Sequence, residues 1–156
     1  MPDESLHLAL WSTAVRESTL KRLRLVPPQK EEWRPVPGAM SFADIAQHIL
    51  DSDLWLFQKL EIRTLRPIQG SAGATHISAR QDYLDILDRL EQAGSRRTEL
   101  IQGLSLEQMD ERIVDQRFGG EVSVWWVIVR GNLDHETHHR GQLATYLRVA
   151  QIDSSE

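Results

Sequence analysis

Apolar residues recur every three or four positions along four stretches of this chain, which is the spacing of amphipathic helices. The stretches span residues 6–25, 42–63, 83–101 and 124–149. Charged residues fill positions between the apolar ones; Arg16 is among them in the first stretch, and Arg97 lies on the flank of the third. The pattern therefore predicts four long helices, each with an apolar and a polar face.

Proline, glycine and capping residues divide these stretches from one another. Prolines between residues 27 and 37 end the first helix, because each removes a backbone donor. Ser41 and Ser123 stand where they can cap the helices that follow them. Residues 64–78 show no periodicity and predict a loop. Between residues 113 and 122 the periodicity fails again, and Gly119-Gly120 predicts a turn in a small hairpin or irregular excursion.

The fold class that follows is all-α: a four-helix bundle with one small irregular or hairpin excursion before the last helix. A chain of 156 residues is long enough to build one core, so residues 1–156 are expected to form a single domain. The three connections are all long enough to cross the bundle or to turn back. The pattern therefore leaves the order of the helices in space open.

Composition excludes several classes of function. With 18 Lys and Arg against 23 Asp and Glu, the formal net charge is -5, the wrong sign for binding phosphate backbones, so no nucleic-acid partner is expected. The chain has no Cys, and therefore no disulfide, thiolate metal site or Cys nucleophile of its own. Its opening lacks a basic segment followed by an apolar run, and no membrane span is apparent. We expect a cytoplasmic protein with no membrane partner.

Histidine is the residue type that points to chemistry. At about 100° per residue, His135 and His139 lie roughly 40° apart on the apolar side of the fourth helix. Such a pair can hold one divalent metal ion, since both rings emerge on the same side one turn apart and imidazole suits borderline-soft ions. Two ligands are too few. His48 is the best candidate for a third, because no other histidine outside the fourth helix lies within a long predicted helix beyond its first turn.

Other interpretations of these histidines stay open at this point. His48 projects roughly 120° from the centre of its apolar stripe, where a partly exposed or hydrogen-bonded side chain is the commoner outcome. The string His135-Glu136-Thr137-His138-His139 matches the H-E-x-x-H pattern of zinc peptidases, in which the Glu is a general base. However, Gln142 and Thr145 stand where the extended peptidase pattern requires Gly and His. A peptidase is therefore disfavoured.

Three segments together resemble the DinB-like superfamily, which includes the YfiT-like and mycothiol-dependent maleylpyruvate isomerase metal-binding domains. The segments are Trp33-Arg34-Pro35-Val36-Pro37-Gly38, Phe42-Ala43-Asp44-Ile45-Ala46-Gln47-His48-Ile49, and the block that begins at Asp134-His135 and ends with His138-His139-Arg140-Gly141-Gln142-Leu143. The resemblance implies a bundle with crossover topology and a divalent transition metal, often nickel or zinc, held by three side chains. Carried over position by position, those ligands are His48, His135 and His139.

The resemblance also implies a homodimer. Val129, Leu133 and Leu147 form a second apolar strip on the fourth helix, roughly 100° from the histidines. Such a strip is compatible with a dimer surface, and equally with packing on a neighbouring helix.

Two functions are consistent with this resemblance. The first is a metal-dependent enzyme acting on a small molecule, either a thiol-dependent S-transferase or isomerase or a hydrolase, with a low-molecular-weight thiol as an external cofactor. His138, Glu136 and Arg140 are its candidates for acid/base or anion-holding roles, although Glu136 projects roughly 100° from the ligands, as expected of a solvated side chain. The alternative is a non-catalytic, metal-stabilised module for binding or sensing in a stress response.

Overall fold

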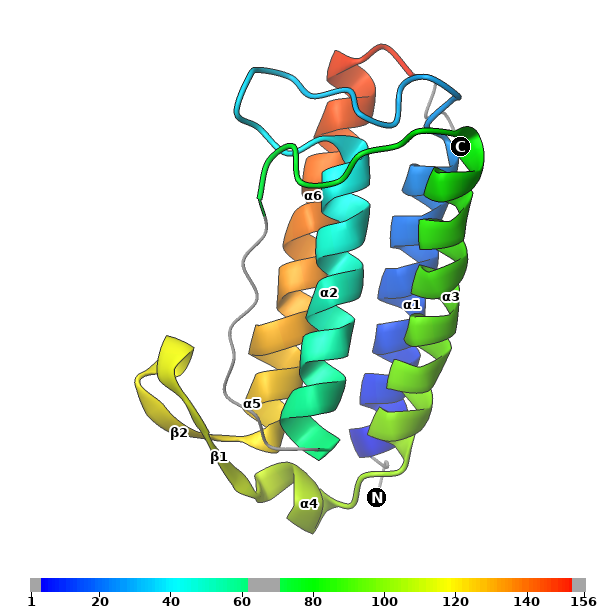
Figure 1. Cartoon of the computed structure of the whole chain (residues 1–156). Helices are drawn as coiled ribbons and strands as arrows, with labels where there is room; N and C mark the ends of the chain where they lie inside the picture. Colours follow the sequence, from blue (N-terminus) through cyan, green and yellow to red (C-terminus); the bar gives the residue numbers. More distant parts are fainter. Residues whose placement is uncertain (1–3, 62–70, 153–156) are drawn as a thin grey trace.

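Four long helical rods lie side by side and form a bundle (Figure 1). The computed structural model describes residues 4–61 and 71–152. The first three rods are α1 (Glu4–Arg24), α2 (Phe42–Glu61) and α3 (Arg80–Gln102). The fourth rod has three consecutive parts, namely α5 (Val124–Ile128), the π-helical segment η2 (Val129–Leu133) and α6 (Asp134–Val149). The predicted all-α bundle is thereby confirmed.

The order of the rods in space follows a crossover topology. α1 contacts α3 and α6, and α2 contacts the same two helices from the opposite side. α2 and α3 run in the same direction, so α3 begins at the opposite end of the bundle from the end of α2 (Figure 1). This is the topology that the family resemblance implied and that periodicity alone left open.

The helix starts follow from local capping. Ser41 and Asp44 form a reciprocal pair, in which the Asp44 backbone N–H donates to Ser41 Oγ at 3.0 Å and the Ser41 N–H donates to Asp44 Oδ2 at 2.9 Å. Ser123 Oγ accepts from the backbone N–H of Trp126 at 3.1 Å and caps α5. Both predicted caps are confirmed. The last two residues of the predicted second helix, 62 and 63, and residues 64–70 of the predicted loop lie outside the described residues.

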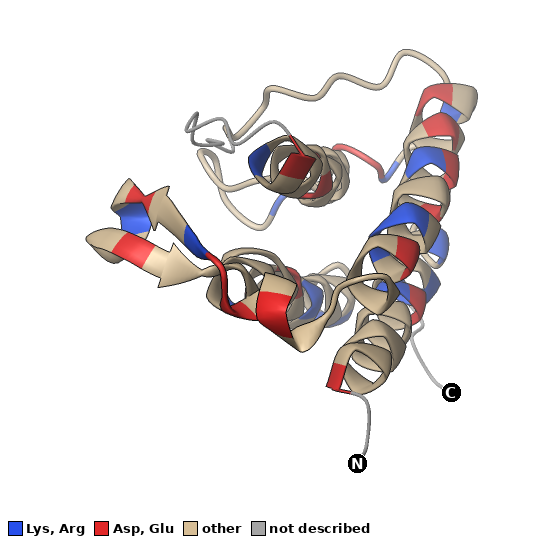
Figure 2. Ribbon diagram, turned by 90° about the horizontal axis from the view of Figure 1, so that it is seen from below, with Lys and Arg blue, Asp and Glu red and all other residues tan. Residues whose placement is uncertain are grey.

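A small antiparallel hairpin occupies the predicted excursion before the last rod. The chain leaves α3 through the short helix α4 (Leu106–Asp110), which sequence periodicity did not predict because five residues are too few to show it. Strands β1 (Arg112–Asp115) and β2 (Gly120–Ser123) then pair, joined by the 3₁₀ turn η1 (Gln116–Phe118). Gly119 and Gly120 have φ values of 83° and 140°, a region that favours glycine. Viewed along the helices, the hairpin stands to one side of the bundle (Figure 2).

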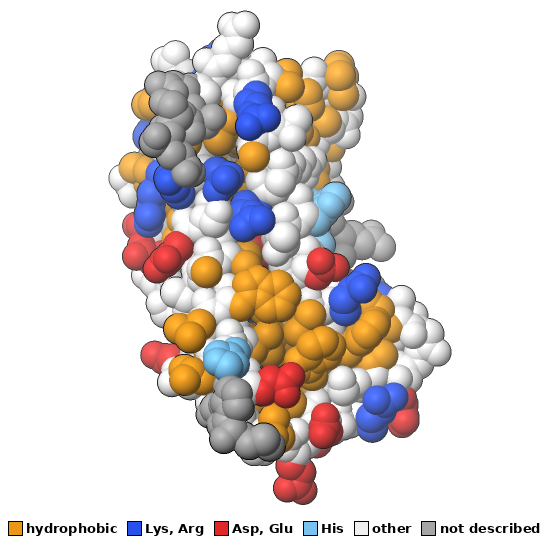
Figure 3. All heavy atoms as spheres, turned by 180° about the vertical axis from the view of Figure 1, so that it is seen from behind, with side chains coloured by type: hydrophobic (Ala, Val, Ile, Leu, Met, Phe, Trp, Pro, Cys, Tyr) orange, Lys and Arg blue, Asp and Glu red, His pale blue; other side chains and the backbone are white. Residues whose placement is uncertain are grey.

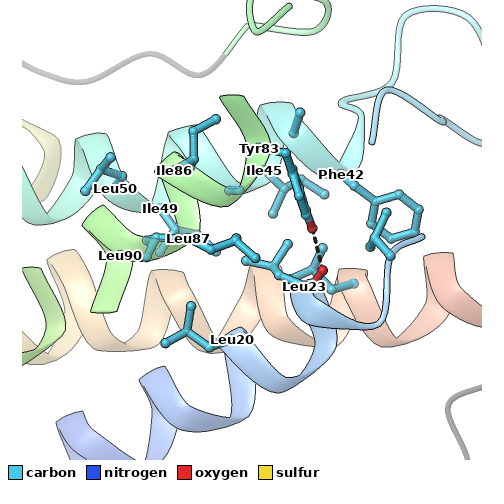
Figure 4. Packing of buried hydrophobic residues seen from close by; sticks show 14 of the residues in the cluster. Leu20, Leu23, Phe42, Ile45, Ile49, Leu50, Tyr83, Ile86, Leu87 and Leu90 are labelled. Atoms are coloured by element: carbon cyan, nitrogen blue, oxygen red, sulfur yellow. Dashed lines mark hydrogen bonds between the residues drawn. The ribbon is translucent and has the colours of Figure 1, made fainter. Parts of the chain in front are cut away.

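The apolar core consists of two clusters, one toward each end of the bundle. The first is built from the later halves of α1 and α6 and the earlier halves of α2 and α3 (Figure 4). In it the Tyr83 hydroxyl donates a hydrogen bond to the backbone carbonyl of Leu23. The second cluster contains Leu8, Trp55 and Ile101 together with residues of α4, β1 and α5.

A buried network of charges lies between these clusters, with one member from each long rod. Its members are Arg16 of α1, Asp53 of α2, Arg97 of α3 and Glu136 of α6, none more than 3% exposed. Arg16 Nη2 donates to Asp53 Oδ2 at 2.7 Å and to Glu136 Oε1 at 2.8 Å. Arg97 Nη1 donates to Asp53 Oδ1 at 3.1 Å and to Glu136 Oε1 at 2.6 Å. The two positive and two negative charges balance, which is the condition under which buried ions are tolerated.

Neutral polar groups complete this network. Thr19 donates to Glu136 Oε2 at 2.8 Å, and Ser12 accepts from Arg97 Nε at 2.7 Å. Gly94 of α3 admits the Arg16 side chain, since a Cβ at that position would lie 2.8 Å from Arg16 Cγ. The sequence pattern placed Arg16 between apolar residues and Arg97 on a helix flank, and it left Glu136 open as a catalytic candidate or a solvated side chain. The structure buries all three side chains, because their charges satisfy one another across helices.

The sequence pattern predicted one regular α-helix for the last rod. This prediction is wrong, because η2 interrupts the helix. Asn132 of η2 accepts from Arg97 Nη1 at 3.0 Å and donates to Asp53 Oδ1 at 3.1 Å and to the Ser52 carbonyl at 3.2 Å. The wider π turn thus coincides with an anchor to the buried network. An angular projection that assumes a uniform helix mispositions residues before the turn relative to those after it.

The apolar strip proposed as one possible dimer surface lies inside the protein. Val129, Leu133 and Leu147 are all buried in the two core clusters, so packing on neighbouring helices accounts for them. Exposed apolar side chains are found instead on the first half of α1, at Leu10 and Trp11, and on α5; the view from behind shows apolar atoms gathered over this region (Figure 3). A homodimer remains a prediction from the family resemblance.

None of the helices in the described part of the chain is both long enough and apolar enough to pass through a bilayer.

Replacing Glu136 with Gln is expected to lower the free energy of unfolding by about 3–5 kcal/mol at neutral pH, because two buried guanidinium groups would then share one carboxylate. Urea denaturation measures this change. Glu17→Gln, an exposed substitution on the same α1 surface as Lys21, is the control and should change the free energy by less than about 0.5 kcal/mol.

The free energies of unfolding of wild type and Glu136→Gln can also be compared as a function of pH. Burial by itself raises the pKa of Glu136, but the charges of Arg97 and Arg16 outweigh it and hold this pKa at about 2, below the ordinary 4.5. The stabilisation is therefore complete above about pH 4.5 and is lost as pH falls toward 2. The stability difference between wild type and Glu136→Gln should narrow across that window; a constant difference would contradict the assignment.

Candidate metal centre

Three imidazole rings meet where α2 lies against α6. His48 lies on the edge of α2 that faces α6, and His135 and His139 lie one turn apart on α6. His48 Nε2 is 2.8 Å from His135 Nε2, which is 3.1 Å from His139 Nε2. The three rings each contribute one nitrogen to a group whose members all lie within 4.8 Å of one another. The structure thus brings together the three residues that the sequence proposed as ligands.

His48 satisfies the geometry because of its position on the edge of its stripe. The centre of the stripe is filled by apolar residues such as Ile45 and Ile49, which are fully buried in the core. An imidazole at the centre would point between the helices, whereas one at the edge reaches the neighbouring α6 while remaining half-buried. The position of His48 on the edge of its apolar stripe made it a weaker candidate in the sequence. The same position brings its ring into contact with α6.

The three imidazoles are neutral at physiological pH. Burial, reinforced by the neighbouring rings of His139 and His48, lowers the pKa of His135 to about 3. Burial likewise lowers the pKa of His139 to about 4, although its hydrogen bond to Gln142 acts in the opposite direction. Burial also lowers the pKa of His48, against the effect of the Asp51 carboxylate. Neutral rings with available lone pairs are the form that binds a cation.

Gln142 fixes the orientation of one ring. His139 Nδ1 lies 2.8 Å from Gln142 Oε1, and Gln142 Nε2 donates to the Tyr146 hydroxyl at 3.1 Å. Tyr146 is in turn held edge-on by Trp33 and Phe42, with ring centroids 5.6 and 5.7 Å away. Because the amide oxygen can only accept, the proton of His139 is placed on Nδ1 and its Nε2 lone pair is directed toward the other two rings.

The donor set fits a divalent transition metal. Three nitrogens at about 2.0–2.1 Å from a tetrahedral ion would lie about 3.3 Å apart. The separations from His135 Nε2 to the other two Nε2 atoms, 2.8 and 3.1 Å, are close to this value. Without a cation, one proton at most can lie between each pair of Nε2 atoms. Nδ1 of His48 and of His135 is buried and has no hydrogen-bond partner in the part of the chain that the structure describes. A cation at the shared point would satisfy the Nε2 lone pairs of the three rings together, and these two Nδ1 atoms are not among its ligands.

The remaining candidates fall outside this cluster. Glu136 lies in the buried network, where its two carboxylate oxygens accept from Arg16, Arg97 and Thr19, so it is not free to act as the general base of an H-E-x-x-H peptidase. His138 is exposed, with its ring 5.1 Å from that of His139. Arg140 is half-buried on the same helix.

Comparison with known proteins identifies the family. The model of the DinB superfamily matches residues 13–143. The chain belongs to the DinB superfamily. The fold of this DinB-superfamily protein is similar to the crystal structure of YjoA, a DinB-like protein from Bacillus subtilis. The similarity has a TM-score of 0.71 at 17% sequence identity and covers 96% of this chain and 95% of YjoA. None of the curated proteins searched matches the chain.

Two residues near the centre were missed as functional candidates in the sequence. Gln142 was not recognised as a partner of His139, although residues three positions apart on a helix are in contact distance. Arg117 lies in the hairpin, where no periodic pattern relates it to the histidines. The positive charge of Arg117 nevertheless helps to lower the pKa of His135. Burial has the largest effect on this pKa, and Arg117 has the smallest of those that lower it.

His139 should carry its proton on Nδ1 in the metal-free protein. Long-range nitrogen–proton NMR of the ring distinguishes the two neutral tautomers. Gln142→Leu removes the acceptor and should produce a mixture of tautomers, whereas Gln47→Leu, a change on α2 beside His48 that removes only a hydrogen bond to Asp51, should not. Equal spectra for wild type and Gln142→Leu would show that the amide does not set the tautomer.

Proposed function

We propose that His48, His135 and His139 hold a divalent transition metal, nickel or zinc, and that the protein is a metal-dependent enzyme acting on a small molecule. The observation that carries this proposal is the convergence of three neutral Nε2 atoms from two separate helices. Three neutral ligands leave coordination positions for other molecules, an arrangement found in catalytic sites more often than in closed structural ones. Membership of the DinB superfamily supports the same assignment.

The reaction we propose is thiol-dependent S-transfer or isomerisation, or a hydrolysis. When bound, the ion supplies Lewis acidity toward a thiol or carbonyl group. A thiol would come from outside, because the chain contains no Cys. The protein's own contribution is to hold His48 and His135 half-exposed at the edge between α2 and α6, and to orient His139 through Gln142.

A second function is favoured by the placement of the ligands. A metal at this position would join α2 to α6, two rods that are far apart in the sequence. The protein would then be a non-catalytic module that metal binding stabilises, serving in binding or sensing. Both functions require the same ion and differ only in turnover.

Purified protein is expected to bind one equivalent of Co²⁺, used as a spectroscopic substitute for zinc or nickel. His48→Ala, His135→Ala and His139→Ala should each weaken that binding by more than about a hundredfold, since a lost ligand costs more than a lost outer-shell partner. His138→Ala is the matched control, because that ring is exposed beside His139. Visible absorption titrations and elemental analysis give the affinities and the native metal. If all four variants bind alike, the triad is not the site.

Chelator and turnover measurements separate the two functions. Metal at a thousand times its dissociation constant stabilises the folded state by about 4 kcal/mol, so removing it should lower the melting temperature under either function. A screen of glutathione, bacillithiol and mycothiol with electrophilic and ester substrates should then show turnover that His135→Ala abolishes. Stabilisation by metal without turnover on any of these substrates would favour the non-catalytic module.

A further inference from the structure

Arg117, at the tip of the hairpin, is held rigidly beside the metal centre. Its guanidinium lies over the Trp55 ring at 3.9 Å from the centroid, and the Phe118 ring is 5.1 Å away. Asp115 accepts from Arg117 Nε at 3.2 Å and from Nη2 at 3.0 Å, and it also accepts from the backbone N–H of Arg117. An arginine fixed on an aromatic face and along one edge loses little entropy when it binds a ligand.

Part of this guanidinium remains available. The contacts to Asp115 use Nε and Nη2, and within residues 4–61 and 71–152 no hydrogen bond involves Nη1. The Arg117 side chain is 38% exposed, whereas the Asp115 side chain is 4% exposed. A further acceptor can therefore reach Nη1 from solvent without displacing Asp115.

The surroundings of Arg117 place it along the same helix faces as the ligands. A Cβ on Gly131 would lie 2.8 Å from Arg117 Nη2 and 3.4 Å from the Trp55 ring, so glycine leaves the space that the guanidinium occupies. Gly131 precedes His135 by one turn and Trp55 follows His48 by two turns. At about 1.5 Å per residue, the guanidinium lies roughly 6–10 Å along the helices from the imidazoles.

This corner is positive in a protein that is negative overall. Lys59, also buried here, donates to the Val114 carbonyl at 2.8 Å and lies 4.0 Å from Asp115 Oδ2. Lys59 and Arg117 against Asp115 leave one positive charge, while the formal charge of the chain is -5. The Asp51 carboxylate, three residues after His48 on α2, lies close enough to His48 to raise its pKa, although burial has the larger effect and lowers it. Of the two cations in this corner, Arg117 is the one that an approaching anion can reach, because its side chain is 38% exposed and that of Lys59 is 2% exposed.

We infer that Arg117 binds the carboxylate of the substrate or cofactor, whose other end reaches the ion held by the three histidines. The inference rests on the proposed function and narrows it to small molecules with a carboxylate a few bonds from the group that meets the metal. A planar guanidinium suits a planar carboxylate, and a charge-assisted hydrogen bond from Nη1 gives the interaction its direction.

Co²⁺-loaded protein tests this with two thiols of the same carbon number, 3-mercaptopropionate, which ends in a carboxylate, and 3-mercaptopropanol, which ends in an uncharged hydroxymethyl group. The absorption band that appears when a thiolate binds Co²⁺ gives both dissociation constants. Wild type should bind mercaptopropionate roughly fivefold more tightly than mercaptopropanol, the scale of one partly exposed ion pair. Arg117→Gln should reduce this ratio to about one while leaving the mercaptopropanol constant unchanged.

Two further variants separate recognition from support of the hairpin. Gly131→Ala keeps the charge but displaces the guanidinium, and it should also lower the ratio. Arg130→Gln is the matched control, since Arg130 also lies over a tryptophan, 5.5 Å from the Trp126 ring, and pairs with Asp134 at 3.3 Å. It should retain the wild-type ratio.

The outcomes distinguish this inference from the function on which it rests. A ratio that Arg117→Gln leaves unchanged, or an equal weakening of both thiols, overturns the carboxylate site while the metal centre stands. Failure of wild type to bind Co²⁺ overturns the proposed function, and the carboxylate site with it, because that site is defined by its distance from the ion.

Discussion

Two guanidinium groups and two carboxylates, buried where the apolar clusters of the bundle meet, determine how the four rods are aligned. Each of Arg16, Asp53, Arg97 and Glu136 comes from a different rod, and each touches charges from two others. Apolar side chains tolerate a helix that slides or rotates, whereas a buried charge deprived of its partner costs several kcal/mol. The clusters supply the driving force for packing, and the charges restrict it to one alignment.

The metal centre depends on that alignment. Glu136 is adjacent to His135 in the sequence, and Asn132, one turn earlier, ties the π-helical segment to Asp53 and Arg97. The same segment brings Gly131 against Arg117. The position of α6 against α2, on which the meeting of His48 with His135 depends, is therefore set by the buried network and not by the histidines themselves. The three histidines are therefore brought together by contacts that other residues make.

Much of this could be predicted from the sequence because it is local. The rods follow from apolar spacing, their starts from Ser41 and Ser123, and the pairing of His135 with His139 from one helical turn. Contacts between different helices were harder to predict from the sequence. The burial of Arg16, Arg97 and Glu136 was not predicted, because a single helix cannot show that its charged side faces opposite charges on other helices. The π turn was not predicted from the sequence, since Asn132, which anchors it, bonds to residues about eighty positions earlier. His48 was found by elimination and family resemblance, and its contact with α6 could only come from the packing.

The distribution of charge among the rods has a consequence for assembly. Within the buried network, both cations belong to α1 and α3, and both anions belong to α2 and α6. A folding intermediate in which only one of these pairs has formed would bring like charges together in a desolvated interior, where they repel. Neutrality is reached only when the two half-bundles join, so partially formed species are disfavoured and the chain should collapse to its native arrangement cooperatively. A dication between α2 and α6 would sit on the anionic half, where it would relieve the repulsion before that union is complete.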